Sequence, residues 1–80
     1  MDVFEKVKEI IVSELSVDEN QVTREARIVE DLGADSLSMV ELMMGIESAF
    51  KEFDIEISEE EAQNLPTVGE LVDFLKSKLD

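Results

Sequence analysis

Ser36 is the residue of this chain that is best placed to take part in chemistry. It lies in the run Val29-Glu30-Asp31-Leu32-Gly33-Ala34-Asp35-Ser36-Leu37, between an acid and a leucine, where an amphipathic helix is predicted to begin. The chain contains no histidine and no cysteine, so there is no imidazole to take the proton of the Ser36 hydroxyl. We therefore interpret Ser36 as a residue that another protein modifies, and not as the nucleophile of an active site.

The acids before Ser36 raise the question of a calcium site. Asp31, Gly33 and Asp35 alternate like the first residues of an EF-hand loop. Ser36, however, stands where that loop needs a glycine, and Leu42 stands where it needs a bidentate glutamate. The sequence therefore predicts no designed metal site.

Charge limits the classes of partner. The 80 residues include 21 acids and seven bases, for a net charge of -14, which repels nucleic-acid phosphates and anionic membranes and attracts basic protein surfaces. No apolar run approaches the roughly 18 residues that cross a bilayer, and the first residues lack the basic and then apolar order of a signal peptide. We expect a cytoplasmic protein with basic protein partners, no nucleic acid and no membrane insertion.

Hydrophobic residues make up 44% of the chain and recur at helical spacing, unlike those of a disordered acidic tail. A first helix is predicted over residues 2–15, and the Ser36 helix follows an ordered loop over 16–35 with a helical turn near 18–22. Ser58 and Glu61 form a capping box that opens a short helix, and Thr67 opens the last one. We predict an all-α four-helix bundle, three longer helices and one short, as a single domain over residues 1–80. Apolar residues expected to anchor the loop are Val17, Val22, Ile28, Val29 and Leu32.

The helix that follows Ser36 carries two apolar stripes. The broad one is expected to face the core and comprises Met39, Leu42, Met43, Ile46, Ala49, Phe50 and Phe53. The second comprises Leu37, Val40 and Met44, flanked by Glu41, Glu47 and Ser48. In so small a bundle, a second stripe bordered by acids indicates a surface for a partner. The alternative is that this stripe extends the core, if the last helix wraps further around the bundle.

The segment Glu30 to Leu37, followed by Val40-Glu41-Leu42, resembles the attachment motif of acyl carrier proteins, and the layout of the whole chain is similar to theirs. The resemblance implies a four-helix bundle whose Ser36 hydroxyl receives 4'-phosphopantetheine from coenzyme A, with Asp35 and Leu37 beside it. A separate phosphopantetheinyl transferase would catalyse this step. The thiol of the attached arm would then hold acyl groups as thioesters, and the carrier itself would not be an enzyme.

The resemblance also implies a docking surface and a place for the acyl chain. Partner enzymes are expected to dock on a surface formed by Asp35, Leu37, Val40, Glu41, Met44 and Glu47. The residues expected to line an acyl pocket are Met39, Met43, Ile46 and Phe50. The chain departs from the family at Ser38 and Ser48, where fatty-acid carriers often have acids, and in a longer segment between Phe50 and Ile55. Gly45 within the helix costs about 1 kcal/mol relative to alanine, for a reason that the sequence does not reveal.

We therefore predict a free-standing, monomeric acyl carrier that shuttles growing acyl chains between enzymes of dissociated fatty-acid biosynthesis. Asp35 in place of a histidine before the serine favours this function over that of a peptidyl carrier. Two alternatives remain open at this stage. One is a carrier for a polyketide or D-alanyl pathway. The other is an acidic interaction module without a prosthetic group, which binds a basic partner through Val40 and Met44.

Overall fold

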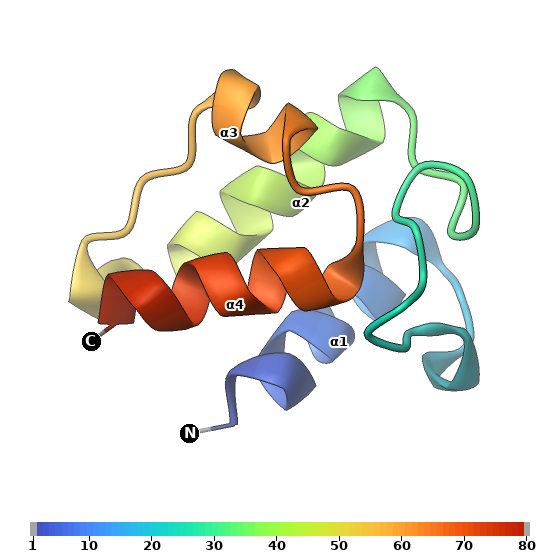
Figure 1. Ribbon diagram of the computed structural model, residues 1–80, viewed down its shortest axis with the longest axis horizontal. Helices are drawn as coiled ribbons and strands as arrows, with labels where there is room; N and C mark the ends of the chain where they lie inside the picture. Colours follow the sequence, from blue (N-terminus) through green and yellow to red (C-terminus); the bar gives the residue numbers. More distant parts are fainter. Residues whose placement is uncertain (1, 80) are drawn as a thin grey trace.

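The computed structural model describes residues 2–79 and is all-helical (Figure 1). Met1 and Asp80, the ends of the predicted domain, lie outside the described residues. Loop 16–35, with its 3-10 turn, separates the first two α-helices, as predicted. None of the helices in residues 2–79 is long and apolar enough to cross a membrane. The elements in chain order are α1 (Val3–Leu15), η1 (Glu19–Gln21), α2 (Ser36–Ala49), η2 (Lys51–Phe53), α3 (Glu59–Gln63) and α4 (Val68–Leu79).

Helix starts are fixed by short polar side chains. The Glu5 amide donates to the Asp2 carboxylate at 3.3 Å at the start of α1. At α3 the predicted capping box is complete, because the Glu61 amide donates to the Ser58 hydroxyl and the Ser58 amide donates to the Glu61 carboxylate, both at 3.1 Å. At α4 the Glu70 amide donates to the Thr67 hydroxyl at 3.2 Å. These bonds satisfy donors that a helix leaves unpaired at its first turn.

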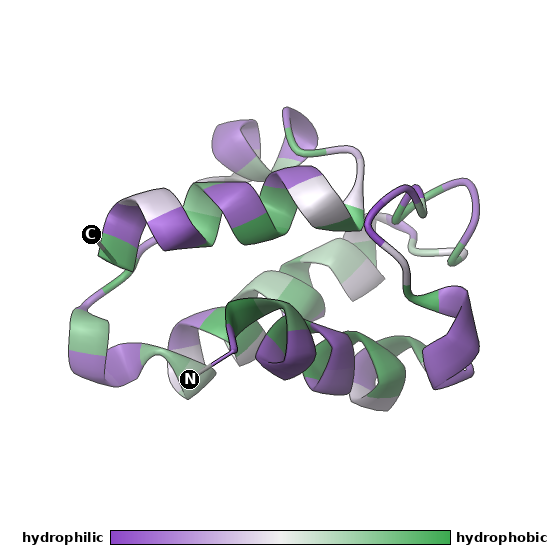
Figure 2. Cartoon of the chain, turned by 60° about the horizontal axis from the view of Figure 1, so that its bottom comes forward, coloured by the Kyte–Doolittle hydropathy of each residue, from purple (hydrophilic) through white to green (hydrophobic). Residues whose placement is uncertain are grey.

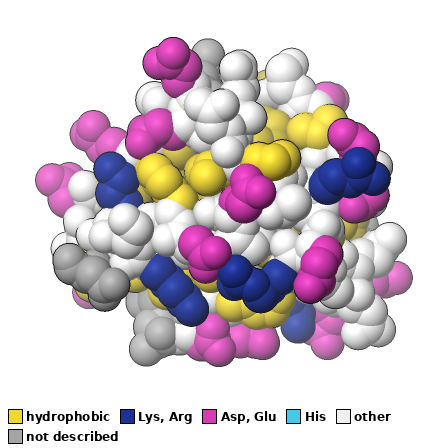
Figure 3. Space-filling view, in the orientation of Figure 1, with side chains coloured by type: hydrophobic (Ala, Val, Ile, Leu, Met, Phe, Trp, Pro, Cys, Tyr) yellow, Lys and Arg dark blue, Asp and Glu magenta, His cyan; other side chains and the backbone are white. Residues whose placement is uncertain are grey.

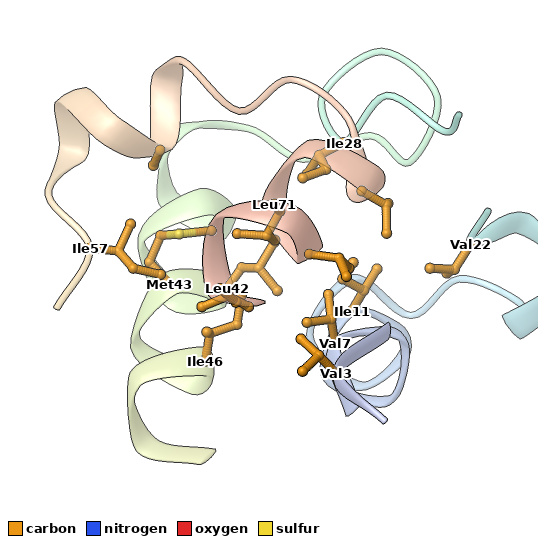
Figure 4. Packing of buried hydrophobic residues seen from close by; sticks show 14 of the residues in the cluster. Val3, Val7, Ile11, Val22, Ile28, Leu42, Met43, Ile46, Ile57 and Leu71 are labelled. Carbon is orange, nitrogen blue, oxygen red and sulfur yellow. The ribbon is translucent and has the colours of Figure 1, made fainter. Parts of the chain in front are cut away.

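The core lies where α1, α2 and α4 meet, with their hydrophobic faces turned inward (Figure 2). Leu71 of α4 lies between Leu42 of α2 and Ile11 of α1 (Figure 4). The loop contributes Val22, Ile28 and Leu32 to the same cluster. Helix packing thus supplies the stability of a chain that has no disulfide.

Two residues predicted to be buried are exposed. Phe53 is 47% exposed because the α-helix ends before it, and η2 leaves its ring tilted against Phe50 at 6.3 Å between centroids. Val29 is 55% exposed, because its neighbour Ile28 points into the core and the chain turns there. The second stripe of α2 is also exposed at Leu37, Val40 and Met44. The alternative in which that stripe extends the core is therefore wrong.

Gly45 lies where α1 approaches α2. A Cβ atom at Gly45 would be 3.2 Å from Cγ2 of Ile10 and 3.7 Å from a carboxylate oxygen of Glu14. A separation of 3.2 Å is tighter than ordinary van der Waals contact. The glycine therefore lets the two helices pack closely, which offsets its poor helix propensity.

Backbone hydrogen bonds join the long loop to the segment before α4. The Ile28 amide donates to the Pro66 carbonyl at 2.9 Å, and the Val68 amide donates to the Ala26 carbonyl at 3.0 Å. These bonds flank an isolated antiparallel bridge between Arg27 and Thr67. The loop is thus ordered, as predicted, and it delivers the chain to α2 in a defined position.

Candidate functional site

Ser36 is the first residue of α2, and Asp35 is its N-cap. Oδ1 of Asp35 accepts a hydrogen bond from the Ser38 amide at 2.8 Å, which fixes the start of the helix. Ser36 is exposed, and its hydroxyl has no hydrogen-bond partner among the described residues. The geometry therefore leaves the Ser36 hydroxyl open to solvent at the first turn of α2.

The turn before Ser36 depends on Gly33. This residue has a φ of +77°, and an added Cβ would meet nothing within 4 Å. A positive φ is easily adopted by glycine and strains most other residues. The Ala34 amide donates to the Ile28 carbonyl at 3.1 Å, and Ala34 itself is buried. The chain thus turns at Gly33, anchors at Ala34 and emerges at Ser36.

Negative charge dominates the approach to Ser36. The hydrogen bond from the Ser38 amide lowers the pKa of Asp35, and the one from the Arg27 amide lowers the pKa of Asp31. The Arg27 guanidinium is already engaged by Glu30 at 2.6 Å and by Asp31 at 3.5 Å. The approach to Ser36 is therefore lined by ionised carboxylates, and the nearby Arg27 guanidinium is already paired with two of them.

The distribution of charge sets α2 apart from the rest of the molecule. The lysines and arginines belong to α1, the loop, η2 and α4, and none belongs to α2. On the face that α4 presents, basic side chains stand among the acids (Figure 3). The charged side chains of α2 are Glu41 and Glu47 alone. This helix therefore offers an acidic surface with exposed apolar residues.

A groove begins at Ser36 and runs along α2. Its volume is about 600 Å³, and its walls come from α2, from the loop around Val29, and from α3 with the chain on either side of it. Its mostly apolar side chains include Ile28, Val29, Met39, Val40, Met43, Met44, Ile57, Ala62, Leu65 and Pro66. The groove has the size and lining that suit an apolar ligand.

The structure separates the four residues expected to line an acyl pocket into two pairs. Met39 and Met43 line the groove. Ile46 and Phe50 do not line it, because both are fully buried in the core cluster. The α2 periodicity does not distinguish these pairs, since all four residues lie on one broad face.

The expected docking residues lie along α2, with the exposed Asp35 at its N-cap, but they differ in exposure. Leu37, Val40, Glu41 and Met44 are exposed. Glu47 is half-buried, and its Oε2 accepts a hydrogen bond from the Ile57 amide at 2.8 Å. Its carboxylate therefore has a structural partner that the sequence did not predict.

Sequence reasoning missed the groove residues outside α2. Ile57, Leu65 and Pro66 belong to the segments around α3, and Val29 belongs to the loop. Only Val29 could have been found from the sequence. Two adjacent loop residues such as Ile28 and Val29 seldom both face the core, so one of them was to be expected at the surface. The other three are brought to α2 only by tertiary packing. Within residues 2–79 no group of three or more acids is placed to hold a metal ion.

Comparison with known proteins agrees with this geometry. Residues 5–75 match the family model described as a phosphopantetheine attachment site. The fold is similar to that of the acyl carrier protein from Enterococcus faecalis, with a TM-score of 0.75 and 39% sequence identity. That match covers 95% of this chain and 92% of the Enterococcus chain.

Proposed function

Because the chain belongs to the acyl carrier proteins, the family that carries a phosphopantetheine attachment site, we propose that Ser36 is the residue that receives the arm. The chain is thus a carrier and not an enzyme. The observation that carries the proposal is the exposed Ser36 hydroxyl at the first turn of α2, without a partner among the described residues. With no histidine in the chain, the base that removes its proton belongs to the transferase.

The residues around Ser36 fit a phosphodiester-linked arm. The Ser36 hydroxyl has no hydrogen-bond partner within residues 2–79, and the space next to Gly33, three residues before it, is open. The thiol at the end of a bound arm supplies the thioester chemistry. The chain itself holds the arm at Ser36 and offers a groove for an attached acyl chain. Met39 and Met43 line that groove, and flexible thioether side chains adapt well to an alkyl chain.

We further propose that enzymes with basic surfaces dock on α2. Asp35 and Glu41 would attract them, and Leu37, Val40 and Met44 would supply the apolar contact. The negative charge on α2 raises the rate of encounter with a positively charged partner more than it raises the affinity. Glu47 belongs to the same surface, although its carboxylate also holds Ile57.

The pathway we propose is dissociated fatty-acid synthesis, in which this domain of residues 1–80 works as a cytoplasmic monomer. Support comes from Asp35 before the serine and from the similarity to a bacterial acyl carrier protein over nearly the whole chain. The alternative is a polyketide or D-alanyl pathway, and the acyl group held as a thioester would distinguish it from fatty-acid synthesis. Intact mass spectrometry of protein purified from its native source identifies that acyl group directly.

Replacing Ser36 with alanine tests the attachment site. The S36A variant should fold normally, because alanine is a good helix former, and should gain no mass when incubated with coenzyme A and a purified phosphopantetheinyl transferase. S38A is the matched control, because the Ser38 amide still donates to Asp35, and it should gain the mass of one phosphopantetheine. Labelling of S36A would show that another residue is the site. No labelling of the unaltered protein by an active transferase would favour an interaction module without a prosthetic group.

A further inference from the structure

Two neighbouring hollows of the surface share a pair of lining residues that are hydrogen-bonded to each other. The groove of about 600 Å³ runs from Ser36 along α2. A second hollow, of about 720 Å³, lies beyond it and is lined by Phe53, Asp54 and Lys78. Glu47 and Ile57 line both hollows. Oε2 of Glu47 accepts a hydrogen bond from the Ile57 amide at 2.8 Å, so this bonded pair stands at the boundary between them.

The two sides of the boundary differ in chemistry. On the Ser36 side, the groove presents apolar side chains such as Met39 and Met43. On the other side, the hollow presents charged groups that include Asp54, Glu56 and Lys78. An alkyl chain gains by displacing water from the first surface, whereas it gains little among charged groups that must keep their own hydration.

Opening the boundary also has a cost of its own. The Ile57 side chain is buried and Glu47 is half-buried. A chain that passed between them would separate the carboxylate from the amide and leave two polar groups poorly solvated. The boundary therefore resists an alkyl chain more than the apolar walls before it do.

From this geometry we infer that Glu47 determines the length of acyl chain that the groove can shelter, because its bond to the Ile57 amide closes the far end. The inference rests on the proposed function, in which the chain enters from Ser36. Ser36 and Glu47 lie on the same helix, about 16 Å apart along its axis at a rise of roughly 1.5 Å per residue. Carbons beyond the closure lie outside the groove and contribute no further burial.

The test uses the full chain loaded with saturated acyl groups that are lengthened stepwise. A transferase attaches each acyl-phosphopantetheine from the corresponding acyl-coenzyme A, and intact mass confirms loading. The melting temperature of the unaltered protein should rise with chain length and then level off. In Glu47→Ala, which lacks the acceptor, the plateau should move to longer chains. In Glu47→Gln, the matched control that keeps an acceptor oxygen without the charge, the plateau should stay near that of the unaltered protein.

Amide hydrogen exchange of the unaltered protein gives a second readout that needs no variant and no partner enzyme. Exchange at Ile57 should stay slow at every chain length, because carbons beyond the closure lie outside the groove and leave the bond from the Ile57 amide to Glu47 intact. The inference alone is overturned if the melting temperature rises with length but levels off at the same length in all three proteins, or if long acyl groups make Ile57 exchange fast in the unaltered protein. If the unaltered protein failed to load, the proposed function would be overturned together with the inference. If every protein loaded but no melting temperature depended on chain length, the proposed shelter of the acyl chain in the groove would be overturned instead.

Discussion

Alanine substitutions at Ile46 and Met44 separate the core of α2 from its docking surface. Ile46 is fully buried, and Met44, two residues before it, is 61% exposed. Large-to-small substitution at a buried isoleucine costs about 2 to 5 kcal/mol, because burial is lost and a cavity remains. Exposed substitutions usually stay within about 0.5 kcal/mol, and alanine also suits the helix at Met44.

The size of the domain makes this difference easy to measure. At about 0.05 to 0.15 kcal/mol per residue, a chain of this length has a total stability of roughly 4 to 12 kcal/mol. A loss of about 3 kcal/mol at Ile46 would therefore remove a large share of it. At roughly 4 to 8 °C for each kcal/mol, the melting temperature of Ile46→Ala should fall by about 12 to 24 °C.

Thermal melts, urea titrations and the rate of modification by a purified transferase are the measurements for this pair. Met44→Ala should melt within a few degrees of the unaltered protein, at about 4 °C or less, yet be modified more slowly. Ile46→Ala should lose stability and, under conditions where it remains folded, be modified at a nearly normal rate. If Met44→Ala were as unstable as Ile46→Ala, the exposed stripe would belong to the core. Equal modification rates for Met44→Ala and the unaltered protein would remove Met44 from the docking surface.

Three further predictions follow from charge and packing. Glu41→Lys should slow association with a basic partner at low salt, and the difference from the unaltered protein should shrink as salt is added. Glu25→Lys makes the same charge change on the loop and should slow association less. Equal effects of the two variants in stopped-flow experiments would mean that only net charge matters. Gly45→Val should destabilise by about 1 to 3 kcal/mol through overpacking against Ile10, and an unchanged urea midpoint would refute the close-contact explanation. The hydrogen bond from the Ser38 amide lowers the pKa of Asp35 from its ordinary value of 3.8. The ionised Asp35 carboxylate therefore stabilises the fold at pH values above 3.8, and this stabilisation is lost as the pH falls through the lower pKa of the folded state. The difference in unfolding free energy between the unaltered protein and Asp35→Ala should therefore shrink with acidification, and a difference that is constant with pH would exclude this role for the carboxylate.

Local chemistry made the helix starts and the position of Ser36 predictable from sequence. Asp35 and Ser58 each cap a helix by bonding an amide three residues later, so the signal is contained in four consecutive residues. The exposed stripe of α2 was also predictable, because a single helix can bury only one broad face in a small bundle.

The features that could not be predicted from the sequence depend on how the helices pack against one another. Phe53 continues the helical spacing of α2, but the helix ends first, so periodicity misplaced it. Gly45 has meaning only once α1 lies across it. The bond between Glu47 and Ile57 crosses from α2 to the connection before α3, and no pattern within either segment indicates such a partner.

The bridge between the long loop and the segment before α4 has a consequence for the order of folding. Helical bundles fold quickly when their contacts are local in sequence. The hydrogen bond between Ala26 and Val68 instead closes a loop of the chain that contains all of α2 and α3. Closing this loop costs less entropy once the two helices have packed, so we expect the bond to form after them. We expect the bridge to be absent from the transition state, so weakening it should speed unfolding and leave folding almost unchanged. Ser36 would then reach its final position only at the last stage of folding, and a transferase that requires this geometry would modify completed molecules only.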